Sequence, residues 1–97
     1  MSHLRLVAAD PTTARWFKCG RLVAIPVKRG KRLPVLALLA QEFEPGVYYS
    51  EAQVNEALRE FHPDVAALRR YLVEEGFMSR TPGGFSYWRT GGESQLA

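Results

Sequence analysis

Apolar positions between residues 63 and 75 recur with the spacing of an α-helix. Val65, Leu68 and Leu72 stand at i, i+3 and i+7, which is one stripe of a helix with 3.6 residues per turn. Pro63 fits the first helical position, because a proline lacks the N–H group that would be unpaired there. Gly76 fits the position just past the last turn. The pattern predicts a helix over 63–75, and we expect the rest of the chain to fold around it.

Two further helices are predicted before this one. An apolar face predicts a helix that begins at Leu33 or Pro34, ends at Phe43 and is the most buried of the three. Ser50 and Gln53 have the spacing of a capping box, which predicts a second helix from there to Glu60. The side chains expected to point inward are Leu33, Leu36, Leu39 and Phe43 in the first helix, and Val54, Ala57, Leu58 and Phe61 in and after the second.

The first quarter of the chain has weaker signals. Asp10 and Pro11 suit the N-cap and first position of a helix of about two turns, which Gly20 would end. Residues 22–25 are apolar and predict a short strand or an extended buried segment. Residues 1–9 fit a frayed strand or a tail, and Trp16 is expected to pack against the core.

A hairpin is predicted at the other end of the chain. Residues 77–80 and 85–89 flank a turn at 81–84 that is rich in proline and glycine. We expect Phe85 and Tyr87 to cover the end of the core, although an aromatic trio of Phe85, Tyr87 and Trp88 could instead stack on bases. Residues 47–49 predict a short strand with one of its two tyrosines inward.

This order of elements is that of a winged helix–turn–helix. We predict an α+β fold with three core helices, a short strand, a C-terminal β-hairpin wing and a short N-terminal helical extension. The expected divisions are an extension over 1–15, a winged-helix-like domain over 16–89 and a disordered tail over 90–97.

Length and composition narrow the class of protein. The 97 residues suffice for one domain. No apolar run approaches the ~20 residues of a membrane span, and the first ten residues do not resemble a signal peptide. A cytoplasmic protein with no membrane contact is therefore expected. Cys19 is the only cysteine, which excludes an internal disulfide. We expect it to be a small buried hydrophobe, with a redox sensor as the alternative because Lys18 and Arg21 could lower its pKa.

Positive charge is concentrated in the first third of the chain. Residues 1–32 contain eight Lys or Arg and one acid, a net charge of +7, whereas residues 33–97 contain five basic and nine acidic side chains, a net charge of −4. This asymmetry indicates either an anionic partner or docking of the basic segment on the acidic remainder of the fold.

The cations suggest an interface with duplex DNA. We expect Lys28, Arg29, Lys31 and Arg32 to lie on a loop before the first core helix, because Gly30 interrupts regular structure. With Arg80 and Arg89 of the wing they would contact phosphates, which supply most non-specific affinity for DNA. The third helix also carries Asp64, Glu74 and Glu75, so on its own it would bind DNA weakly.

Two arginines of the third helix have separate interpretations. Arg70 is expected to point outward, where it either contacts a base edge or phosphate or forms an ordinary i,i+4 pair with Glu74. Arg69 is expected at the edge of the core, paired with an acid such as Glu56 or Glu60.

Catalytic chemistry has little support in the sequence. His3 and His62 lie far apart, and His62 is expected to be an N-cap or turn residue. There is no nucleophile–base set, glycine-rich phosphate loop or metal-ligand spacing. We therefore expect no enzyme activity and no cofactor.

Several segments together resemble a known family. They are GRLVAIPVKRGKR (20–32), YSE (49–51), VN (54–55), LRRYLVEEGF (68–77) and YWR (87–89). Over about residues 16–89 the chain resembles the domain of unknown function 2087, whose members are small bacterial domains that stand alone or are attached to helix-turn-helix regulators. The resemblance implies a winged-helix-like domain loosely linked to transcription regulation. Nothing before Trp16 resembles an attached regulator, so a stand-alone member is expected.

The functional hypothesis that combines these observations is a small DNA-binding, transcription-regulatory protein. Its partner would be double-stranded DNA, contacted by the third helix, the 28–32 segment and the wing. The alternative is a protein-interaction or dimerisation module that uses the same fold without touching DNA. A homodimer would fit the first hypothesis as well, because helix-turn-helix proteins often pair to span two half-sites.

Overall fold

The computed structural model describes residues 11–90, which form four helices and two small antiparallel hairpins. The expected Asp10 cap, residues 1–9 and tail residues 91–97 lie outside the described residues. In chain order the elements are α2 (Pro11–Ala14), β1 (Phe17–Lys18), β2 (Arg21–Leu22), α3 (Arg29–Ala40), α4 (Glu51–Arg59), α5 (Val65–Glu74), β3 (Met78–Arg80) and β4 (Tyr87–Arg89). The α+β class is therefore confirmed.

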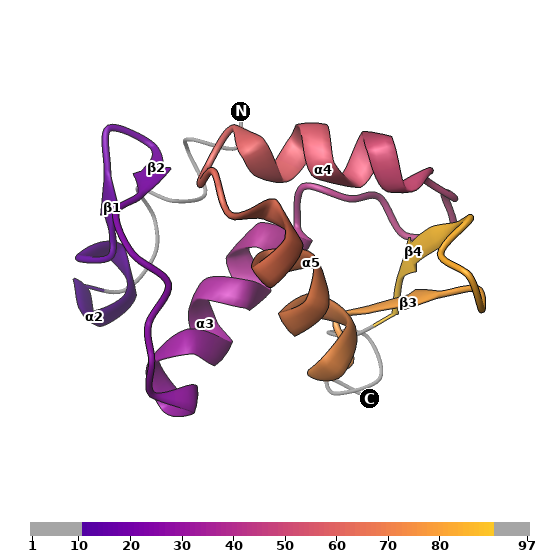
Figure 1. The fold of residues 1–97 in the computed structure, drawn as a ribbon. Helices are drawn as coiled ribbons and strands as arrows, with labels where there is room; N and C mark the ends of the chain where they lie inside the picture. The colour runs from indigo at the N-terminus through magenta and orange to yellow at the C-terminus, as the bar shows by residue number, and fades with distance from the viewer. Residues whose placement is uncertain (1–10, 91–97) are drawn as a thin grey trace.

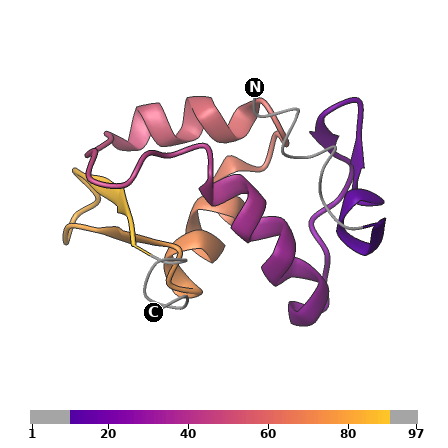
Figure 2. The ribbon, with the colours of Figure 1, turned by 180° about the vertical axis from the view of Figure 1, so that it is seen from behind.

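Three helices enclose the core. Helix α4 lies across α3 and α5, and the two hairpins lie at opposite ends of the molecule (Figures 1 and 2). The fully buried aliphatic side chains come from all three helices: Val35, Leu36 and Leu39 of α3, Val54 and Leu58 of α4, and Leu68 and Leu72 of α5. Six of these seven positions are the inward ones that the helical spacing predicts, because the apolar stripe of each helix has to be removed from water. Val35 is not among the predicted positions, and the expected Leu33 is only partly buried.

The caps of α4 and α5 explain where these helices begin. The Ser50 hydroxyl accepts a hydrogen bond from the Gln53 N–H, and the Gln53 side chain accepts one from the Ser50 N–H, so the predicted capping box is present. Helix α5 begins at Val65 rather than at Pro63, because Asp64 is its N-cap and accepts from the Ala67 N–H. His62 lies in the preceding turn, where its Nδ1 accepts from the Asp64 N–H at 3.0 Å.

The start of α3 differs from the prediction. Residues 29–32 form its first turn instead of a loop, with Lys28 as N-cap, and Gly30 lies inside the helix. Pro34 is also inside the helix and has no N–H to donate. Arg29 and Arg32 of this turn make contacts that the local sequence does not reveal, described below.

The N-terminal region also differs. Helix α2 has a single turn, and the chain then forms the β1–β2 hairpin where a longer helix was expected. Cys19 and Gly20 connect the strands with φ values of 54° and 79°, both positive as a two-residue type I′ turn requires. Cys19 is exposed at this turn, so the expected burial is wrong. The predicted strand over 22–25 is limited to its first residue.

Hydrogen bonds connect the β1–β2 hairpin to the end of α4. The Leu22 N–H donates to the Phe61 carbonyl at 2.8 Å. The Arg21 guanidinium donates to the carbonyls of Arg59 and Glu60 at 3.4 and 2.9 Å, which are acceptors left without partners at the end of a helix. Trp16 is half-buried and packs against the core, as expected.

The C-terminal hairpin is confirmed, with Ser79 opposite Trp88 and Arg80 opposite Tyr87. The predicted strand at 47–49 is reduced to one antiparallel bridge between Tyr49 and Tyr87. Tyr49 faces inward and Tyr48 outward, as the alternation predicts. Tyr87 is buried, but Phe85 is exposed and does not cover the core.

Candidate functional site

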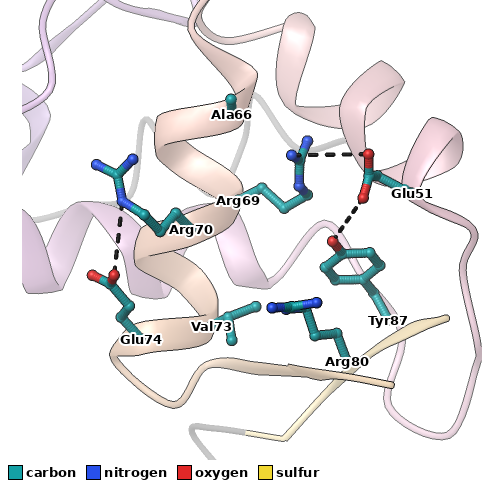
Figure 3. A pocket seen from close by; sticks show the side chains of 8 residues that line it. All are labelled: Glu51, Ala66, Arg69, Arg70, Val73, Glu74, Arg80 and Tyr87. Atoms are coloured by element: carbon teal, nitrogen blue, oxygen red, sulfur yellow. Dashed lines mark hydrogen bonds and ion pairs between the residues drawn. The ribbon is translucent and has the colours of Figure 1, made fainter. Parts of the chain in front are cut away.

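A hollow of about 470 Å³ lies between the outward face of α5, the start of α4 and the β3–β4 hairpin (Figure 3). We call it the arginine hollow. Its lining residues are Glu51, Ala66, Arg69, Arg70, Val73, Glu74, Arg80 and Tyr87. It thus joins Arg70 and Arg80, two of the predicted DNA-contacting residues.

Local structure explains why these side chains meet. Leu68 and Leu72 of α5 are buried in the core. The lining residues of α5, at positions 66, 69, 70, 73 and 74, therefore lie beside this buried face or on the opposite face of the helix. Arg80 and Tyr87 are register partners in the hairpin, and paired residues of antiparallel strands share one face. The Ser50 cap makes Glu51 the first residue of α4, which is the end nearest the hairpin.

Glu51 connects the three elements of the hollow. Its Oε1 accepts a 3.0 Å hydrogen bond from the Tyr87 hydroxyl, and its Oε2 lies 3.9 Å from Arg69 Nη2. Arg69 also donates to the amide oxygen of Asn55 and is mostly buried. The expected position of Arg69 at the core edge is confirmed.

The expected partners of Arg69 are wrong. Glu56 and Glu60 line a different depression together with Arg21 and Arg59, near the opposite end of α4. Arg69 lies instead beside the first turn of α4, where Glu51 and Asn55 are one helical turn apart on the same face.

The environment of Tyr87 favours its neutral form. Burial raises the pKa of the Tyr87 hydroxyl, and the hydrogen bond and negative charge of Glu51 raise it further. The positive charges of Arg69 and Arg80 act in the opposite direction. Tyr87 is therefore a hydrogen-bond donor at neutral pH that fixes the orientation of Glu51.

Arg70 and Arg80 are the most accessible cations of the hollow. The Arg70 side chain is 59% exposed, and its Nε lies 3.7 Å from Glu74 Oε2, which confirms both the outward direction and the i,i+4 pair. Arg80 is exposed and forms no ion pair within residues 11–90. Both guanidinium groups can therefore reach a ligand in solution.

The basic first turn of α3 is held against the end of α5 by Glu75. Arg29 makes three hydrogen bonds of 2.8–3.1 Å with the Glu75 carboxylate, and these bonds hold the pKa of Glu75 below its usual range despite opposing desolvation. Arg32 Nη2 lies 3.9 Å from the same carboxylate. Arg32 Nη1 donates to the carbonyls of Pro26 and Val27 at 3.3 and 2.8 Å, so Arg32 is mainly a structural residue.

Tyr71 joins the two groups of cations. The Arg32 guanidinium lies 4.2 Å from the centre of the Tyr71 ring, and the Arg70 guanidinium lies 5.2 Å from it. The electron-rich face of an aromatic ring attracts a cation, and this attraction adds to that of the carboxylates beside Arg32 and Arg70. The start of α3 and the arginine hollow are therefore connected through one aromatic side chain.

The remaining predicted cations are placed differently. Lys28 and Lys31 are exposed at the start of α3 and form no ion pair in the described part of the chain. Arg89 is half-buried at the base of the hairpin, where it donates to the Phe43 carbonyl at 3.3 Å, and it does not line the hollow.

Sequence reasoning missed Glu51, Tyr71 and Tyr87 as members of this surface. Glu51 and Tyr87 are 36 positions apart, and no local pattern predicts their contact. The sequence contains one indication for Tyr71, because this aromatic residue directly follows Arg70 in the predicted third helix.

Other kinds of site are not seen in the part of the chain that the structure describes. Within residues 11–90 no group of three or more His, Cys, Asp or Glu side chains is arranged to hold a metal ion. None of the described helices has the length and apolar character needed to cross a bilayer.

Comparison with known proteins places the chain in a family. No curated protein and no solved structure matches it. The family described as "uncharacterized protein conserved in bacteria" (DUF2087) matches residues 21–89, from β2 to the last residue of β4. Since this match covers well over half of the chain and includes α3, α4, α5 and the arginine hollow, the protein belongs to the DUF2087 family, as its motifs predict.

Proposed function

We propose that this protein binds duplex DNA and regulates transcription through a winged helix–turn–helix arrangement. The order of α3, the Tyr49–Tyr87 bridge, α4, α5 and the β3–β4 hairpin supports this assignment. In it α5 is the third helix, whose outward face meets the DNA, and the β3–β4 hairpin is the wing.

The observation that carries the proposal is the stacking of Arg32 and Arg70 on Tyr71. Through it the basic start of α3 continues into the arginine hollow and reaches Arg80 of the hairpin. The surface contains seven cations and the three carboxylates Glu51, Glu74 and Glu75, a net charge of +4. The cations are Lys28, Arg29, Lys31, Arg32, Arg69, Arg70 and Arg80. Neutralising phosphates with a surface of this sign releases counterions and drives binding.

Arg70 is the best placed residue for contacts with base edges. Ala66, one turn before it, is exposed and small enough to let α5 approach the groove closely. An exposed i,i+4 pair contributes only about 0.2–0.5 kcal/mol, so Arg70 can leave Glu74 for a guanine edge at little cost. The two acids of the α5 C-terminal turn mean that phosphate contacts from α3 and the hairpin have to supply most of the affinity.

Fluorescence anisotropy of a labelled random duplex at about 50 and 200 mM salt tests the proposal. With about six phosphate contacts the affinity should fall with a log–log slope near −5. Lys28→Glu combined with Lys31→Glu removes the two unpaired cations of α3 without disturbing the Arg29–Glu75 contact, and it should weaken binding strongly and reduce the slope by about 2.

The matched control reverses Lys18 and Arg59, which gives the same change in net charge. Both residues are exposed and belong to the end of the molecule opposite the β3–β4 hairpin. This variant should bind nearly as tightly as the natural chain. Equal losses in the two double variants, or no binding of any duplex at 50 mM salt, would contradict the proposal.

One observation favours the alternative of a protein-interaction or dimerisation module. Tyr48 is 69% exposed and forms an edge-to-face pair with Trp88, with ring centres 5.4 Å apart. Trp88 points away from the side of the hairpin that carries Arg80, because neighbouring strand residues alternate. Sedimentation of the natural chain and of Tyr48→Ala would detect self-association through this surface.

A further inference from the structure

Phe85 is an exposed aromatic side chain next to the arginine hollow. Its side chain is 80% exposed, although an apolar side chain of this size gains about 1.5–3 kcal/mol when it is buried. The expectation that it covers the core is wrong, since Tyr87 fills that place. The ring is therefore accessible to a ligand.

The turn that presents Phe85 is held by its own hydrogen bonds. The Thr81 hydroxyl accepts from the N–H groups of both Phe85 and Ser86 at 3.1 Å. The Gly84 N–H donates to the Thr81 carbonyl at 2.9 Å, and the Thr81 N–H donates to the Ser86 carbonyl at 3.0 Å. The backbone at Phe85 is thus ordered before any ligand arrives, which lowers the entropy lost on binding.

Glycines determine where the ring and the turn lie. Gly83 has a φ of +91°, and a Cβ on it would lie 3.0 Å from the Phe85 ring, so the ring rests against bare backbone. A Cβ on Gly84 would lie 3.1 Å from Glu51 Oε1 and 3.7 Å from Arg80 Nη1. The residue before Phe85 therefore borders the arginine hollow.

The charge of the hairpin defines the partner. Residues 77–90 contain two arginines and no Asp or Glu, and their other polar groups are mostly hydroxyls. Arg80 has no ion pair within the described residues and lies on the same hairpin as Phe85. An exposed apolar ring on a hairpin that carries two arginines and no acid is complementary to stacked bases flanked by phosphates.

We propose that Phe85 is an apolar wedge that enters between two stacked base pairs of the bound duplex, unstacks them and bends the DNA. The inference rests on the proposed function. Insertion of an apolar side chain lowers the stacking of one step and allows the bent duplex to contact more of the protein. The step that accepts the wedge at least cost is a pyrimidine–purine step such as TA, which is the most easily unstacked.

Duplexes that carry 2-aminopurine at a central TA step test this proposal, because the fluorescence of that base rises when it is unstacked. The natural chain and Phe85→Leu, which keeps an apolar wedge, should raise the fluorescence and shorten the end-to-end distance of a doubly labelled duplex. Phe85→Ala should abolish both signals and weaken binding about tenfold. Tyr48→Ala, which removes an exposed aromatic away from the turn, should keep both signals.

The outcomes separate this inference from the proposed function. In one outcome, binding depends on salt and is weakened by the Lys28→Glu, Lys31→Glu double variant, yet it gives no 2-aminopurine signal. That result would overturn the wedge and leave the DNA-binding proposal standing. Identical signals in Phe85→Ala and the natural chain would also overturn it. No binding to any duplex would overturn both. Loss of self-association in Phe85→Ala without an effect on DNA would assign the side chain to a protein contact instead.

Discussion

The Tyr87 hydroxyl donates a 3.0 Å hydrogen bond to Oε1 of Glu51, and this contact joins the C-terminal hairpin to the first turn of α4. Because burial and Glu51 raise the pKa of Tyr87, the folded state retains this proton at a pH where the unfolded chain has lost it. The contribution to stability is complete below about pH 10, the pKa of an unperturbed tyrosine, and is lost as the pH rises through the higher pKa of the folded state.

Tyr87→Phe should therefore lower the free energy of unfolding at pH 7 by roughly 1 kcal/mol, the usual net value of a hydrogen bond. The difference between variant and natural chain should shrink above about pH 10. Urea unfolding at pH 7, 9, 10 and 11 measures this dependence. Tyr48→Phe, at an exposed site, is the control and should not change the pH profile; a constant difference for Tyr87→Phe would contradict the prediction.

The contact of Arg29 with Glu75 predicts the opposite pH dependence. The hydrogen bonds from Arg29 lower the pKa of Glu75, so their contribution to stability is present above the unfolded pKa near 4.3 and is lost as the pH falls through the lower folded pKa. Glu75→Gln should destabilise the protein at pH 7 and have little effect near pH 2. Glu74→Gln is the matched control, and it should change stability less because Glu74 and Arg70 are both exposed.

Cys19 adopts a backbone conformation that cysteine disfavours. Its φ of 54° costs about 1 kcal/mol for most L-residues, whereas asparagine tolerates it and is common at this position of type I′ turns. Cys19→Asn should therefore raise the free energy of unfolding by about 0.5–1 kcal/mol. Cys19→Val should lower it, because a β-branched side chain is worse at positive φ. Thermal unfolding of the three chains in reducing buffer measures both changes.

The capping box of α4 provides a test of coupling within the fold. Ser50→Ala should cost about 1 kcal/mol, because the Gln53 N–H loses its acceptor at the start of the helix. Gln53→Ala removes the reciprocal bond to the Ser50 N–H. Since the two side chains act as one unit, the double variant should lose less than the sum of the single losses. Strict additivity in urea unfolding would show that the two bonds act independently.

The sequence predicted those parts of the fold in which local pattern and long-range packing agree. Leu68 and Leu72 have helical spacing and lie in the core, Ser50 and Gln53 cap α4, and the Pro/Gly turn connects β3 to β4. Local pattern failed at the start of α3. Gly30 and Pro34 both disfavour a helix, but Arg29 finds Glu75 46 positions away, a contact that no local rule contains.

In the candidate site, too, the sequence predicted the local features and missed the long-range contacts. The outward direction of Arg70 and its pairing with Glu74 follow from helix geometry alone. Phe85 and Tyr87 have the same alternation in the sequence, and only the closure of the hairpin on Tyr49 makes Tyr87 the buried one. The hollow itself arises from packing among α4, α5 and the hairpin, which the sequence did not specify locally.

The unusual start of α3 has a consequence for how dissolved ions act on this protein. Lys28, Arg29, Lys31 and Arg32 crowd the positive end of the helix dipole, and no acidic residue lies in the first turn. Added electrolyte screens this self-repulsion, and it also screens the attraction between the exposed Arg29 and Glu75. The same electrolyte competes with any phosphate for the same side chains. Ionic strength therefore has two opposing effects on the stability of the unliganded protein at this turn, whereas it only weakens the binding of a phosphate.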